Sequence, residues 1–255
     1  MAKQSKKDAE RAKQEEHKAR LADVKARRRQ EPLLERRKPV LKEKPTILIY
    51  CEGQNTEPSY FSKFKISSAS ILAYGEGRNT VSLVEQAKKI VIQNKKKGKS
   101  FQQVWCVFDA DPKGDNPQQI INFNEAIALS KKYGFKTAYS NQAFEYWLLL
   151  HFEDHQGGAM RRADYDAKLN HYLKPYDLTY DGKSSKIVTP GIFEVLTENT
   201  GMDKNGKPKT RTHLAVNRAE KTYNKHGEKD NHSNPGSEES STTVFKLVEE
   251  LQKWS

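Results

Sequence analysis

Short apolar runs alternate with amphipathic segments over residues 46–152. Four runs of five or six residues are mostly apolar, as in strands that are buried on both faces of a sheet. They cover residues 46–51, 70–74, 104–108 and 135–139. The intervening and following segments, 56–65, 80–94, 117–133 and 143–152, have apolar positions spaced as on helices. Thr56 and Thr80 stand where helix-capping residues are favoured, and Pro58 fits a first helical turn.

This alternation predicts an α/β fold. A strand, a helix and a second strand in succession form a βαβ unit with a right-handed crossover. Repeating the unit gives a mainly parallel, Rossmann-like sheet with helices on both faces. Ligands of such sheets bind beyond the carboxyl ends of the strands. We therefore expect residues 45–152 to form a sheet domain whose functional edge lies at those strand ends.

The pattern changes after residue 152. Helical segments are predicted at 161–173, 190–198, 214–225 and 242–254. Polar loops rich in Gly, Lys, Asn and Ser are predicted at 201–210 and 227–240. No internal repeat is visible. Residues 153–255 are therefore predicted to form a helical C-terminal extension that packs on the sheet domain.

Residues 1–44 form a basic N-terminal arm. It has 16 Lys and Arg against 8 Asp and Glu, which accounts for +8 of the net charge of +12. Its composition favours a helix, but such a helix would be polar all round and only marginally stable alone. Two interpretations stay open: a solvated, partly disordered arm, or an arm that contacts nucleic-acid phosphates. The candidate nucleic-acid-binding residues are Arg27, Arg28, Arg29, Arg36, Arg37 and Lys38.

The distribution of apolar residues argues against a membrane location. The arm has few large apolar residues, the longest apolar runs are far shorter than a membrane span, and the Lys-rich start lacks a signal peptide. Cys51 and Cys106 fall inside predicted strands, which favours two reduced core thiols. Two cysteines without a His/Cys cluster give no zinc signature. We expect a cytoplasmic protein without a membrane partner. The oligomeric state stays open, and a homo-oligomer is compatible with the sequence.

Acidic residues follow two of the predicted strands. Glu52 directly follows the first strand, and Asp109 and Asp111 follow the third at positions i and i+2, which point the same way in extended backbone. Three carboxylates at one edge would repel one another, and a divalent cation removes that conflict. Oxygen ligands select Mg²⁺, with Mn²⁺ as a substitute, over zinc. The sequence therefore predicts a Mg²⁺ site suited to phosphate chemistry, although an Asp after a strand is also a common turn residue.

Two further acids have open roles. Glu57 lies five residues after Glu52, where the predicted helix begins, and either reaches the same edge or serves as a first-turn acid favoured by the helix dipole. Glu145 stands in an otherwise almost wholly apolar helix. A buried carboxylate there needs a cation or a hydrogen-bond partner. A metal ion or a structural ion pair would each meet that need.

Three segments of the chain resemble motifs of RloB-like proteins. They are ILIYCEGQNTEPSYF at residues 47–61, VWCVFDAD at 104–111 and SNQAFEYWLLLHF at 140–152. Asn234 and Pro235, followed by STTV at 241–244, resemble the closing segment of that family. The resemblance spans about residues 45–255, with the segments in the same order.

The resemblance implies the TOPRIM fold, which topoisomerases, primases and nucleases of the OLD class share. Glu52 matches the acid after the first strand of that fold, and Asp109 and Asp111 match its DxD pair. Glu57 matches the second acid of the OLD-type opening motif, while the third acidic position varies in the fold and matches Glu145 less specifically. RloB-like proteins occur in restriction-modification and abortive-infection loci, often beside an ABC/AAA-type ATPase. The resemblance therefore implies phage defence with an ATPase partner.

The leading hypothesis is a metal-dependent nuclease that hydrolyses phosphodiester bonds in nucleic acid. Glu52, Asp109 and Asp111 would hold one Mg²⁺, while Glu57 and Glu145 would assist a second ion or orient water. RNA, and tRNA in particular, is favoured over DNA because some related TOPRIM defence effectors act on it.

Two other hypotheses compete with the nuclease. One is a non-catalytic nucleic-acid-binding or sensor subunit that works with the ATPase partner. The other is a phosphatase of haloacid-dehalogenase type, suggested by the Asp-x-Asp pair. The second is disfavoured because Asp111 is followed by Pro112 and Lys113 rather than by the usual continuation of that motif, and because it leaves Glu52 unexplained.

Overall fold

The computed structural model describes residues 2–30, 45–75, 79–110, 117–155, 158, 160, 162–202, 206 and 208–254. The chain divides into two compact units, Met1–Glu43 and Lys44–Ser255. The second unit contains the predicted sheet domain together with the predicted C-terminal extension.

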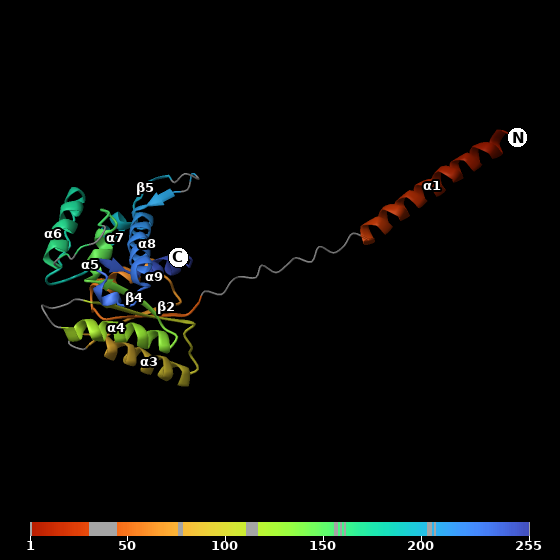
Figure 1. The fold of residues 1–255 in the computed structure, drawn as a ribbon. Helices are drawn as coiled ribbons and strands as arrows, with labels where there is room; N and C mark the ends of the chain where they lie inside the picture. Colours follow the sequence, from red (N-terminus) through yellow and green to blue (C-terminus); the bar gives the residue numbers. More distant parts are fainter. Residues whose placement is uncertain are drawn as a thin grey trace. The chain divides into compact units, whose positions relative to one another are not determined.

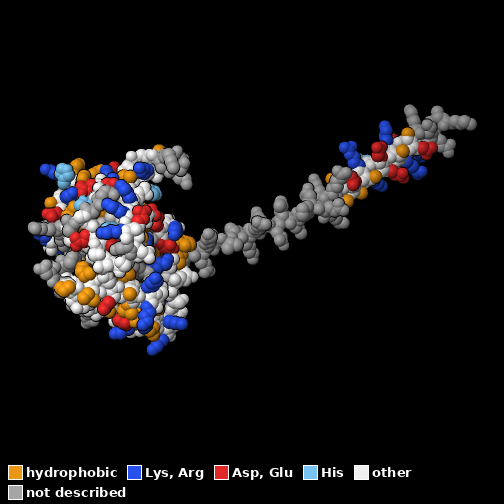
Figure 2. All heavy atoms as spheres, viewed as in Figure 1, with side chains coloured by type: hydrophobic (Ala, Val, Ile, Leu, Met, Phe, Trp, Pro, Cys, Tyr) orange, Lys and Arg blue, Asp and Glu red, His pale blue; other side chains and the backbone are white. Residues whose placement is uncertain are grey.

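The first unit contains helix α1 (Ala2–Gln30). The side chains of residues 7–26 are all exposed, and basic and acidic side chains are interspersed along the helix (Figure 2). The helix therefore buries no face within its own unit. The side chains of the candidate nucleic-acid-binding residues Arg27, Arg28, Arg29, Arg36, Arg37 and Lys38 lie outside the described part of the structure.

A five-stranded sheet with the order β2-β1-β3-β4-β7 forms the centre of the second unit (Figure 1). Its strands are β1 (Ile47–Cys51), β2 (Ala69–Ala73), β3 (Gln103–Asp109), β4 (Lys136–Asn141) and β7 (Ser241–Thr242). The first four strands run parallel, and β7 runs antiparallel to β4. The α/β fold with a mainly parallel sheet that the sequence predicted is confirmed.

Helices cover both faces of the sheet because alternate strand residues point to opposite sides. Ile49 and Cys51 of β1 belong to one apolar core, whereas Tyr50 between them belongs to the other. On the Tyr50 face lie α3 (Thr80–Lys96) and α4 (Pro117–Lys132), which pack together (Figure 1). Cys51 and Cys106 are free, buried and on opposite faces, which confirms the prediction of two core thiols.

The opposite core is built from helices that come from the whole length of the second unit. These are α2 (Thr56–Phe61), α5 (Phe144–Leu149), α6 (Arg162–Leu173), α7 (Pro190–Thr197), α8 (Arg211–Asp230) and α9 (Val244–Gln252). Short 3₁₀ turns follow α2 at Ser62–Phe64 and α6 at Lys174–Tyr176, and a third, Pro235–Ser237, packs against α4. Nothing in the described helices is both long enough and apolar enough to cross a membrane.

The C-terminal extension was predicted to be helical, but it also contains short strands. β5 (Asn199–Met202) and β6 (Pro208–Thr210) form a small antiparallel hairpin, and β7 adds an edge strand to the main sheet. Strands of two to four residues are too short to give a periodic signal in the sequence. The extension also shares one apolar core with β1 and β3, so it completes the sheet domain.

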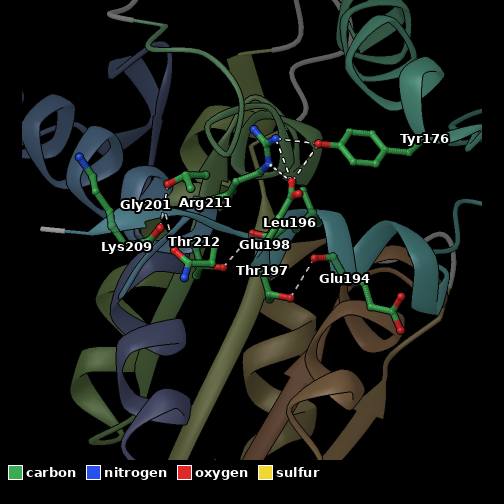
Figure 3. Close-up of polar contacts among 11 residues, drawn as sticks. Tyr176, Glu194, Leu196, Thr197, Glu198, Gly201, Lys209, Arg211 and Thr212 are labelled. Atoms are coloured by element: carbon green, nitrogen blue, oxygen red, sulfur yellow. Dashed lines mark hydrogen bonds and ion pairs between the residues drawn. The ribbon is translucent and has the colours of Figure 1, made fainter. Parts of the chain in front are cut away.

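A polar network joins the ends of α7 and α8 at the base of the hairpin (Figure 3). The Arg211 guanidinium donates to Glu198 Oε2 from Nε at 3.2 Å and from Nη2 at 3.0 Å, and the Tyr176 hydroxyl donates to the same oxygen at 2.9 Å. These donors lower the pKa of the Glu198 carboxyl. The buried Thr212 hydroxyl donates to the Leu196 carbonyl at 3.0 Å. The network fixes the position of the base of the β5–β6 hairpin relative to α7 and α8.

His151, at the end of α5, makes the stability of the core dependent on pH. Its side chain is fully buried, and Nδ1 lies 3.1 Å from the Trp147 carbonyl oxygen. Burial lowers the pKa of His151 to about 3, against about 6.5 in an unfolded chain. Between pH 3 and pH 6.5, His151 binds a proton in the unfolded chain but not in the folded one. The contribution of the neutral, buried His151 to the free energy of unfolding is therefore complete above pH 6.5 and is lost as the pH falls toward 3.

We therefore expect the free energy of unfolding to fall by up to about 1.4 kcal/mol per pH unit between pH 6 and pH 4 because of His151 alone. Urea denaturation across this range should show a shallower pH slope for His151→Gln than for the unmodified chain. His171→Gln, at an exposed position on α6, is the matched control and should leave the slope unchanged. Equal slopes for all three proteins would contradict the assignment.

Candidate active site

Glu52 and Asp109 lie side by side at the carboxyl ends of β1 and β3. Cys51, the last residue of β1, pairs with Val107, two residues before the end of β3, and the Glu52 amide donates to the Val107 carbonyl oxygen at 2.8 Å. The Asp109 amide then donates to Glu52 Oε2 at 3.3 Å. The two acids that the sequence placed at one edge of a parallel sheet are therefore neighbours.

The Asp109 carboxylate also ties this edge to helix α5. Its Oδ2 accepts a hydrogen bond from the Phe144 amide at 3.0 Å, and the Ala110 amide donates to the Ser140 carbonyl oxygen at 2.9 Å. These two hydrogen bonds join the end of β3 to the last residues of β4 and to the start of α5. Because Glu145 is the next residue after Phe144, this contact ties the start of the helix that carries Glu145 to the end of β3.

Glu57 folds back from α2 toward the turn that follows β1. Only 5% of the residue is exposed, and its carboxylate lies so close to Gly53 that a Cβ there would overlap it. Burial, and secondarily the charge of Glu57, raises the pKa of the Cys51 thiol. Glu57 therefore acts electrostatically on the end of β1, and glycine at position 53 makes room for its carboxylate.

Glu145 is fully buried, and its partner comes from the C-terminal half of the chain. The Tyr180 hydroxyl donates to Glu145 Oε1 at 3.0 Å and lies 3.2 Å from the Thr56 hydroxyl at the start of α2. Burial and the charge of Glu145 raise the pKa of Tyr180. The hydroxyl therefore stays protonated, and one tyrosine links the helices that carry Glu57 and Glu145.

Helix α6 adds two polar groups to this neighbourhood. Burial raises the pKa of Tyr165 to about 12, and the charges of Asp109 and Glu145 add to the effect. The Asp166 carboxylate lies against Gly182, where a Cβ would overlap it, and its charge contributes to the raised pKa of Tyr180. Tyr165, Asp166 and Tyr180 were not predicted as site residues from the sequence. Each stands in a polar segment, and the local pattern of such a segment does not distinguish a buried residue from a surface one.

The donor chemistry of this edge fits a hard divalent cation. Glu52, Glu57, Asp109 and Glu145 offer oxygen ligands only, which suit Mg²⁺ and Mn²⁺ rather than zinc. Asp111, the third predicted ligand, lies outside the described residues. Within the described ranges, no three His, Cys, Asp or Glu side chains are grouped so that they could hold a metal ion. Of the three predicted ligands, Glu52 and Asp109 lie next to each other, and their binding of a metal ion stays a prediction.

A family model for RloB-like proteins matches residues 47–251. The chain belongs to the RloB-like protein family. The family match begins at β1 and ends inside α9, so in this RloB-like chain the sheet, the acidic edge and the C-terminal helices form one evolutionary unit. The resemblance seen in the sequence motifs is confirmed. No curated protein and no solved structure matches the chain.

Replacing Tyr180 by phenylalanine should destabilise the fold. The variant loses the hydroxyl that donates to the buried Glu145 carboxylate, and removing one partner of a buried polar group costs about 1–3 kcal/mol. Urea denaturation at neutral pH measures the loss. Tyr176→Phe is the matched control, because its hydroxyl also donates to a glutamate but in an exposed network, where the cost should be smaller. Equal losses in the two variants would contradict the role given to Tyr180.

Proposed function

We propose that this RloB-like protein is a Mg²⁺-dependent nuclease of the TOPRIM type, which hydrolyses phosphodiester bonds in nucleic acid. The observation that carries the proposal is the contact between Glu52 and the Asp109 amide at the carboxyl ends of two adjacent parallel strands. Ligand sites of open parallel sheets lie at this edge. Glu52 and Asp109 bring two carboxylates to this edge, and holding them close together is costly unless a cation or buried donors compensate their charges.

The acidic residues would have different roles in hydrolysis. Glu52 and Asp109, with Asp111, would hold the Mg²⁺ ion, which when bound lowers the pKa of coordinated water and stabilises charge on the reacting phosphate. Glu57 and Glu145 would orient the attacking water and accept its proton. The Tyr180 hydroxyl would fix the orientation of Glu145, because it holds Oε1 from the side of the C-terminal half.

The biological setting of the proposal rests on the family. We place the enzyme in the cytoplasm as the effector of an anti-phage abortive-infection system, together with an ABC/AAA-type ATPase partner. RNA, and tRNA in particular, is the favoured substrate over DNA. The basic arm would supply phosphate contacts, since it holds +8 of the chain's net charge of +12.

The test is a cleavage assay of the purified protein with RNA, tRNA and DNA in Mg²⁺, in Mn²⁺ and in EDTA, with and without the ATPase partner. We expect cleavage that needs the metal and that falls more than about 100-fold in Glu52→Gln and in Asp109→Asn, because even groups that only support metal ligands contribute 10–100-fold. Asp109→Asn retains an oxygen that can accept from the Phe144 amide, so the fold should persist. Glu125→Gln, at an exposed position on α4, is the control and should cleave normally.

Two outcomes would end the nuclease proposal. The first is cleavage by Glu52→Gln and Asp109→Asn at the rate of the unmodified protein. The second is binding of nucleic acid without metal and without turnover in any condition, which would instead identify a binding or sensor subunit of the ATPase.

Neutralising the arm should weaken nucleic-acid binding. Replacing Arg27, Arg28, Arg29, Arg36, Arg37 and Lys38 by glutamine is expected to lower affinity and to flatten its dependence on salt, by about 0.7–0.9 in the log–log slope for each phosphate that the arm no longer neutralises. Fluorescence anisotropy at several salt concentrations measures both quantities. A variant with lysine at the five arginine positions keeps the charge and should keep the slope. An unchanged slope after neutralisation would exclude the arm from binding.

A further inference from the structure

A cavity lies beside the first half of strand β4, among α4, α8 and α9. Its volume is about 600 Å³, within the roughly 300–1,000 Å³ of small-molecule sites. It exists because β7 pairs only with Ser140 and Asn141 of β4, so no described strand covers β4 on this side before Ser140. None of its lining residues belongs to the acidic edge.

Three lysines give this cavity a positive lining: Lys131, Lys136 and Lys246. Lys136 Nζ donates to the neutral Gln103 side chain at 3.1 Å, and Lys246 Nζ lies 3.7 Å from the centre of the Tyr223 ring. Within the part of the chain that the structure describes, none of the three lysines forms an ion pair. Their charges are therefore available to an anion.

One carboxylate also lines the cavity, but it is already engaged. Glu250 accepts hydrogen bonds from Gln103 at 2.7 Å, from Trp254 at 3.1 Å and from Lys253 at 3.1 Å. These contacts hold its pKa near 2. The negative charge of Glu250 is therefore engaged by these donors. With three lysines and one carboxylate, the lining keeps an excess of positive charge.

The wall next to Lys246 is fixed in place by a stack of rings. Tyr223 and His232 stack with ring centres 3.9 Å apart and planes 19° apart. His232 Nδ1 lies 2.9 Å from an oxygen of the buried Glu238 carboxylate, which holds the imidazole in this orientation. Because His232 covers one face of Tyr223, Lys246 must lie over the other. The ammonium group is therefore positioned before any ligand arrives.

The remaining lining is apolar or able to form hydrogen bonds. Ile127, Phe135 and Pro235 supply apolar surface, and Thr137 and Asn231 supply polar groups. A ligand that fits this lining has a phosphate or similar anion at one end and a flat, mostly apolar group with polar edges at the other. A nucleotide has both parts.

We propose that this cavity binds a nucleotide, with its phosphate held by Lys131, Lys136 and Lys246 and its base against the apolar wall at Phe135. The nucleotide is either a free mononucleotide or one residue of a nucleic-acid strand, since both present the same chemistry. The site is separate from the acidic edge, so it does not depend on nuclease activity.

Isothermal titration calorimetry of the full chain in EDTA, with adenosine 5′-monophosphate as the probe, tests the proposal. Saturable binding is expected, with weaker binding of inorganic phosphate alone and of adenosine alone. Lys136→Gln and Lys246→Gln should each weaken binding at least about tenfold, as expected when a charge-assisted hydrogen bond is lost. Lys132→Gln is the matched control, because Lys132 is exposed on the same helix as Lys131 but does not line the cavity.

A short oligoadenylate added in competition identifies the source of the nucleotide. Displacement of the mononucleotide supports a site for one residue of a strand, and binding of both together supports a site for a free nucleotide. The proposal is overturned if the mononucleotide gives no binding, or if Lys136→Gln and Lys246→Gln bind it as tightly as Lys132→Gln does. Lys136 is exposed, so its variant should remain folded, and thermal unfolding checks this. Asp109→Asn should bind the mononucleotide normally, which separates this test from that of the nuclease.

Discussion

The cost of holding carboxylates in a folded interior is the constraint on which the rest of this structure depends. A carboxylate that leaves water needs hydrogen-bond donors or a cation. Asp109 takes the Phe144 amide, Glu52 takes the Asp109 amide, and Glu145 takes the Tyr180 hydroxyl. Each of these contacts joins two segments that are far apart in the chain. The hydrogen bonds of these carboxylates therefore join distant segments of the chain near the same edge of the sheet where the candidate catalytic residues lie.

This constraint explains why the C-terminal half is part of the sheet domain. Tyr180 supplies a donor to Glu145, and the α8 residue Arg218 donates to the Leu150 carbonyl oxygen at 2.7 Å, just beyond the end of α5. β7 adds to the sheet beside β4, and α9 packs on the core that β1 and β3 begin. The family match to residues 47–251 spans both halves. A chain cut after residue 152 would lose the Tyr180 hydroxyl that donates to Glu145 and about half of one apolar core.

The acidic edge and the lysine-lined cavity use opposite chemistry at different places on one sheet. The edge lies where parallel strands end and backbone amides are available to anions. The cavity lies where β4 has only the two-residue strand β7 on one side, so side chains from α4, α8 and α9 enclose space beside it. Positive charge at one place and negative charge at the other would let the protein bind a phosphate-bearing ligand away from the proposed metal site.

The sequence by itself determined the four parallel strands, most of the helices and the proximity of Glu52 to Asp109. Apolar runs and helical spacing are local signals, and the parallel arrangement that they imply sends every strand end to one edge. Only the tertiary structure decided the partners of Glu145, the short strands β5, β6 and β7, and the cavity beside β4. Tyr180 lies 35 residues from Glu145 in the chain, and a two-residue strand has no period to detect. Such contacts depend on how separate segments pack, and a local pattern carries no information about that.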